Sequence, residues 1–101
     1  YVADYTAHRI IKLNISSNQI VGWLGTVGSV EGLTSYDATA TCPSLAVGAF
    51  TSIWCRGGRA LQTNPALLIA PRSLAVDATY LYVTLQTGHR ILRFNKATGA
   101  Y

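Results

Sequence analysis

Two cysteines are the residues of this 101-residue chain with the most specific chemistry. Cys42 and Cys55 are its only cysteines, and both lie beside turn-forming residues. Without a Cys-x-x-Cys spacing they cannot supply a four-cysteine zinc site within this chain. The alternatives are a disulfide or two free, buried thiols, and we favour the disulfide because the loop otherwise has little to order it. It would stabilise the fold by about 3 kcal/mol and indicate an oxidising compartment.

The remaining titratable residues follow no catalytic or metal-binding pattern. His8 and His89 are each expected beside a turn, with the ring hydrogen-bonded to backbone, rather than converging on one metal ion. The chain has four carboxylates that share no motif: Asp4, Glu31, Asp37 and Asp77. No nucleophile–base set or phosphate-binding loop is visible. We therefore expect a non-enzymatic protein with no catalytic residue, no metal and no cofactor.

Charged and aromatic residues point to structure and contact surfaces. Asp4 and Arg9 bracket a turn and are expected to form an ion pair across it, while Trp23, Trp54 and Tyr82 are candidate interface aromatics. Trp54 is the best candidate for an exposed or docking aromatic side chain. The net charge of +4 comes from scattered basic residues, which favours solvated strand faces over a nucleic-acid-binding patch.

One stretch of the sequence occurs twice at a constant offset of 81 residues: the first copy runs from Tyr1 to Asn14 and the second from Tyr82 to Asn95. Each copy reads as two short strands around a polar turn, with alternation predicting that Ile91 and Arg93 point away from Leu92 and Phe94. Self-similarity at a fixed offset is the signature of repeat architectures, which indicates an all-β repeat protein.

The repeated motifs resemble those of NHL repeats. The resemblance rests on "YVAD…HRI…N" near the start and on "PRSLAVDATYLYVTLQTGHRILRFNKATGAY" over residues 71–101. It implies a β-propeller in which roughly 40 residues form one four-stranded blade. The segment from Cys42 to Gly58 resembles an insert of some bacterial surface or secreted NHL-repeat proteins.

These patterns divide the chain into three parts. Residues 1–25 are expected to form strands two to four of a first blade, and residues 71–101 strands one to three and the start of a fourth, at Tyr101, of a second blade. Residues 26–70 are expected to be an insertion and connector, opening on a long loop over 26–41. Residues 43–55 could instead form a degenerate strand pair of an extra blade, but we favour the disulfide-pinned insertion. Because the chain starts and stops inside strand motifs, we expect it to be part of a longer protein.

The function expected from this organisation is an extracellular or cell-surface repeat scaffold. Two blades cannot close a propeller, so their open faces call for further repeats or copies of the chain, in a ring or a filament, or for a protein or glycan ligand. The alternatives are a catalytic propeller of lyase or hydrolase type and nucleic-acid binding through a basic face, which the expected disulfide disfavours. No apolar run is long enough to span a membrane.

Overall fold

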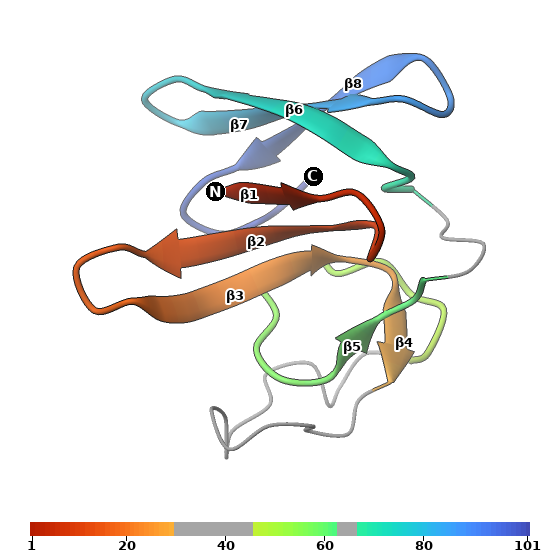
Figure 1. Cartoon of the computed structure of the whole chain (residues 1–101), viewed down its shortest axis with the longest axis horizontal. Coiled ribbons are helices and arrows are strands. Elements are labelled where there is room, and N and C mark those ends of the chain that lie inside the picture. The colour runs from red at the N-terminus through yellow and green to blue at the C-terminus, as the bar shows by residue number, and fades with distance from the viewer. Residues whose placement is uncertain (30–45, 63–66) are drawn as a thin grey trace.

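A computed structural model describes residues 1–29, 46–62 and 67–101, which form three small antiparallel sheets (Figure 1). All the elements of the described residues are strands, so the predicted all-β class is confirmed. The described part of the chain has no helix that is long and apolar enough to cross a bilayer.

The first sheet contains the first copy of the repeated stretch. It consists of β1 (Val2–Asp4), β2 (Arg9–Asn14) and β3 (Gln19–Gly25), in that order. Ala3 pairs with Ile10 and Ile10 with Leu24, so these three side chains share one face. Ile11 pairs with Trp23 on the opposite face.

The second sheet contains the second copy, preceded by one more strand. It consists of β6 (Pro71–Val76), β7 (Tyr80–Leu85) and β8 (Arg90–Asn95). Leu92 and Phe94 are buried whereas Ile91 and Arg93 are exposed, which confirms the predicted alternation. In Figure 1 this sheet lies above the first one, with β6 beside β1.

The third sheet pairs β4 (Val27–Ser29) with β5 (Arg59–Ala60). The prediction of a loop over 26–41 is therefore wrong for β4, because Val27 pairs with Ala60 and is fully buried; residues 30–41 lie outside the described part. Within the insertion, Phe50 and Cys55 make single bridges to Thr26 and Trp23. The insertion thus lies along the end and outer edge of the first sheet.

Turns at equivalent positions adopt the same backbone conformation in the two copies. His8 and His89, which end the hairpin turns, both have left-handed φ angles, of 50° and 46°. After the next strand, Asn14 and Asn95 each accept two backbone N–H groups with their side-chain oxygen, at 2.9–3.2 Å. The repeat is therefore local structure as well as sequence.

The chain's last residues lie outside any strand. Tyr101 packs its ring 5.7 Å from that of Phe94, and the carbonyl of Ala100 accepts the Asn95 N–H at 2.8 Å. A fourth strand beginning at Tyr101 stays a prediction.

Candidate functional site

The two repeat sheets meet in one apolar layer, which we call the seam. Ile10 and Leu24 contribute from the first sheet and Trp54 from the insertion. The second sheet and its connector contribute the rest of the cluster: Leu68, Leu81, Val83, Leu85, Leu92 and Phe94. The seam is the largest described core, so it fixes how the two repeats sit together.

The repeats use opposite faces in the seam. We call the face that carries Ile10 in the first sheet, and its equivalent Ile91 in the second, the front; the back carries Val2 and Val83. Ile10 is 0% exposed and Ile91 67%, whereas Val2 is 43% exposed and Val83 0%. The front of the first sheet thus packs on the back of the second, so the front of the second and part of the back of the first stay open.

Trp54 lies inside this seam. Its side chain is 8% exposed, and its ring centroid is 5.6 Å from that of Tyr1. Its indole N–H donates to the Lys96 carbonyl at 3.0 Å, and its backbone N–H donates to Thr98 at 3.1 Å. The prediction that Trp54 is an exposed docking aromatic is therefore wrong, because the insertion turns inward and uses this residue to join the sheets.

Gly99 lets the insertion approach the turn after β8. Its φ angle is +84°, and a Cβ built on it would lie 2.7 Å from the Trp54 backbone nitrogen. A side chain there would have to displace backbone. The equivalent turn position of the first copy is Asn18, which is exposed and has φ 53°. Of these two equivalent turns, only the one that faces the insertion requires glycine.

Trp23 packs against the insertion rather than between the two repeat sheets. It lies on the back of the first sheet in a small buried cluster with Val27, Cys55 and Ala60. Its indole N–H donates to the Gly57 carbonyl at 2.9 Å. Cys55 is fully buried in this cluster, while Cys42 lies outside the described residues, so the disulfide stays a prediction.

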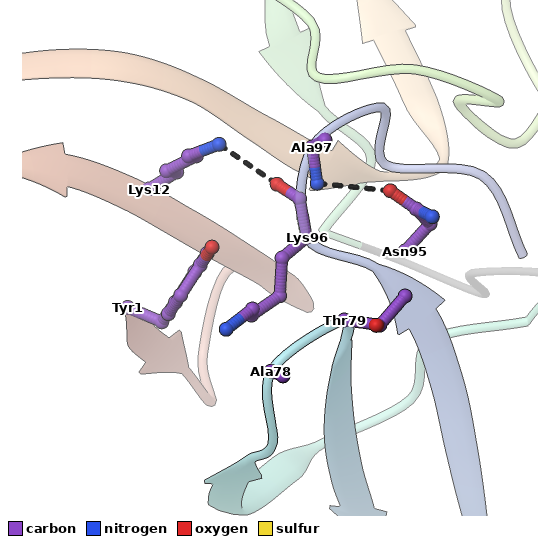
Figure 2. A pocket seen from close by; sticks show the side chains of 7 residues that line it. All are labelled: Tyr1, Lys12, Ala78, Thr79, Asn95, Lys96 and Ala97. Carbon is purple, nitrogen blue, oxygen red and sulfur yellow. Dashed lines mark hydrogen bonds between the residues drawn. The ribbon is translucent and has the colours of Figure 1, made fainter.

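A pocket of about 400 Å³ opens at one end of the seam (Figure 2). Lys12 and Lys96 bring two ammonium groups to it, but both donate to backbone. Lys12 Nζ donates to the Lys96 carbonyl at 2.8 Å, which also accepts from Trp54, and Lys96 Nζ donates to the Asp77 carbonyl. Burial raises the pKa of the Tyr1 phenol, which keeps it neutral. Lys12 therefore links the two sheets across the pocket, whereas the Lys96 ammonium bonds within the second repeat, at the turn before β7.

The turn between β6 and β7 is organised by Asp77. Its carboxylate accepts the backbone N–H groups of Tyr80 at 2.6 Å and Thr79 at 2.7 Å, and the Tyr82 hydroxyl donates to it at 2.8 Å. The N–H of Tyr80, the Tyr82 hydroxyl and the N–H of Thr79 lower the pKa of Asp77, with a smaller effect from Lys96. The same carboxylate raises the pKa of Tyr82. Asp77 therefore caps this turn through hydrogen bonds to backbone N–H groups.

Tyr82, a predicted interface aromatic, lies half-buried on the open front of the second sheet, outside the seam. Its ring lies 6.5 Å from that of Tyr80, whose own ring lies 4.3 Å from the Arg93 guanidinium. Tyr82 is therefore placed on a surface, while its equivalent Tyr1 contacts Trp54 in the seam.

The two histidines lie at the ends of separate hairpin turns. His8 Nδ1 accepts the backbone N–H of Ala70 at 3.0 Å, which ties the first hairpin to the residue before β6. His89 is exposed. Among the described residues no three His, Cys, Asp or Glu side chains lie close enough together to hold a metal ion.

Asp4 and Arg9 are brought together across the first hairpin turn. Arg9 Nε donates to Asp4 Oδ2 at 2.9 Å, and Asp4 Oδ1 also accepts the Ala7 N–H at 3.2 Å. The equivalent of Asp4 is Leu85, which is buried in the seam. An acid occupies this position where the back face is partly open, and leucine where it is covered.

Sequence reasoning missed the seam function of Trp54, Lys12 and Lys96, because their contacts join segments far apart in the chain. The differences between the two copies carried the signal. At back-face positions Asp4 and Leu13 are replaced by Leu85 and Phe94, which are larger or more apolar. Comparison with known proteins adds no further constraint: no protein-family model, curated protein or solved structure matches this chain.

Proposed function

We propose that this chain is a non-enzymatic repeat scaffold built from parts of two NHL-like propeller blades. The support is that two sequence copies fold into similar sheets that stack through opposite faces. Stacking of this kind continues with each added repeat, because every sheet presents a front to the next one. The scaffold acts through contacts with further repeats, copies of itself, or a protein or glycan partner.

The reversed burial of equivalent residues is the observation that carries this proposal. Two sheets related by a twofold axis would bury the same face, so Ile10 and Ile91 would both be covered. Instead one is buried and the other exposed, as in a head-to-tail series. A head-to-tail series leaves one face open at each end, and further repeats or a binding partner would cover these faces.

We place the scaffold outside the cytosol, at the cell surface or secreted. This rests on the Cys42–Cys55 disulfide expected from the sequence, because disulfides persist in oxidising compartments. Peptide mass spectrometry of the non-reduced chain tests the bridge. We expect one linked Cys42–Cys55 peptide, and two separately alkylated cysteines in native protein would remove this argument for location.

The assembly state in solution tests the scaffold function. We expect light scattering on a size-exclusion column to show association that grows with concentration, and electron microscopy to show rings or filaments. A discrete ring would indicate a closed propeller-like unit, and filaments an extended building element. A chain that stays monomeric at every accessible concentration contradicts a scaffold that works by self-assembly.

A further inference from the structure

We propose that the open front of the second sheet is a docking surface for the back of the first sheet of another copy of this chain. The surface is formed by Tyr82, Thr84, Ile91 and Arg93, which share one face of β7 and β8. The proposal rests on the scaffold function and specifies its partner and its surfaces.

The seam within the chain is the template for this contact. From the first sheet, Ile10 is buried against the second sheet, and Lys12 donates to the Lys96 carbonyl at 2.8 Å. Tyr1 packs near Trp54 at one end. An apolar centre with a cation that reaches a turn carbonyl therefore holds the front of one repeat to the back of the next.

The second sheet presents the same chemistry on its front, and none of the residues that the structure describes encloses Ile91 there. Ile91, Arg93 and Tyr82 stand 81 residues after Ile10, Lys12 and Tyr1, and each keeps the residue type or the charge. Ile91 and Arg93 are exposed and Tyr82 is half-buried. Ile91 is thus an exposed apolar side chain beside an arginine and an aromatic residue, the same residue types that the first sheet carries in the seam.

The back of the first sheet provides the complementary surface. Val2 and Leu13 are exposed there, whereas their equivalents Val83 and Phe94 are fully buried in the seam. Ile20, which pairs with Leu13, extends this apolar face and is also exposed. Another molecule of this chain is thus a partner whose matching surface the structure itself supplies.

The turn after β2 completes the match. Asn14 holds the same side-chain hydrogen bonds in this turn as Asn95 does after β8. Ile15 therefore presents its carbonyl at the position that Lys96 occupies in the seam. We assign the Ile15 carbonyl of the other molecule as the acceptor for Arg93. This contact would take the place that the Lys12–Lys96 hydrogen bond has within the seam.

Single charges placed on either face test the proposal. Ile91→Asp places a charge on the front of the second sheet, and Leu13→Asp places one on the back of the first sheet. Both positions are exposed, so each variant should still fold. Each variant should raise the dissociation constant of the self-associated chain by about a hundredfold or more, because docking would bury an unpaired carboxylate. Val47→Asp, at a 61% exposed site in the insertion, is the control and should associate like the unmodified chain.

Mixing the two variants separates this pairing from any other. Leu13→Asp keeps its front and Ile91→Asp keeps its back, so the mixture should form a one-to-one dimer that cannot grow, seen by sedimentation velocity. Circular dichroism checks that each variant is folded. Association that persists in both variants, or a mixture that stays monomeric, overturns the pairing while the scaffold function stands. An unmodified chain that never associates overturns both this pairing and a scaffold that works by self-assembly.

Discussion

The two repeat sheets share a local structure but bury opposite faces. Their strands, hairpin turns and asparagine-stabilised turns correspond at a constant offset, yet Ile10 is enclosed where Ile91 is open. In the first sheet the insertion covers Trp23 on the back, and in the second the back lies in the seam. A repeat's sequence therefore prepares two apolar faces, and its place in the stack decides which one is covered.

The insertion makes the largest difference between the two sheets, so Trp54 gives the largest expected effect. Trp54→Ala should lower the free energy of unfolding by about 3–5 kcal/mol, because it empties the seam and leaves the Lys96 carbonyl with one donor fewer. Urea denaturation measures this. Ile53→Ala, at the exposed neighbouring position, should cost less than about 1 kcal/mol. Equal losses would contradict the placement of Trp54 between the sheets.

Matched substitutions at equivalent positions test the reversal of faces directly. Ile10→Ala should cost about 2–5 kcal/mol, and Ile91→Ala should cost under about 1 kcal/mol at concentrations where the chain is monomeric. For valine the order inverts: Val83→Ala should cost about 2 kcal/mol and Val2→Ala much less. Chemical denaturation of the four variants decides, and similar losses within either pair would mean that the repeats bury the same face.

The two asparagine-stabilised turns carry different residues at their left-handed position, Asn18 in one and Gly99 in the other, and these can be exchanged. Gly99→Asn should destabilise the chain by about 1–3 kcal/mol, because a Cβ there meets the Trp54 backbone. Asparagine tolerates the left-handed conformation, so the loss would report the close approach rather than backbone strain. The reverse change, Asn18→Gly, should be almost neutral in thermal unfolding. A neutral Gly99→Asn variant would show that the insertion does not pack on this turn.

The smallest expected effect is the dependence on pH that the Asp77–Tyr82 hydrogen bond of the second sheet contributes. The pKa of Asp77 lies below its ordinary value of 3.8, so its stabilising contribution is present above that value and is lost as the pH falls through the lowered pKa. The pKa of Tyr82 lies above 10.0, so its contribution is present below pH 10.0 and is lost as the pH rises through the raised value. Asp77→Asn should weaken both dependences. The free energy of unfolding of Asp77→Asn is measured from pH 2 to 11. A pH dependence equal to that of the parent chain would contradict the hydrogen bonds of the Asp77 carboxylate.

The local elements could be predicted from the sequence because short-range patterns encode them. Alternation in β7 and β8 sets which side chains lie together, and the repeated His and Asn positions mark turns whose hydrogen bonds are local. The strand β4 was missed because Val27–Ser29 is short and its pairing partner lies about thirty residues further along the chain.

From the amino-acid sequence follow the all-β class and two copies of a repeat with nearly the same strands and turns. Only the tertiary structure decided which face of each copy is buried, that Trp54 points inward, and that Lys12 and Trp54 share the Lys96 carbonyl. The physical reason is that alternation gives each strand two faces but does not say what will lie against either one. That depends on the neighbouring sheet, whose residues lie far along the chain or in another molecule.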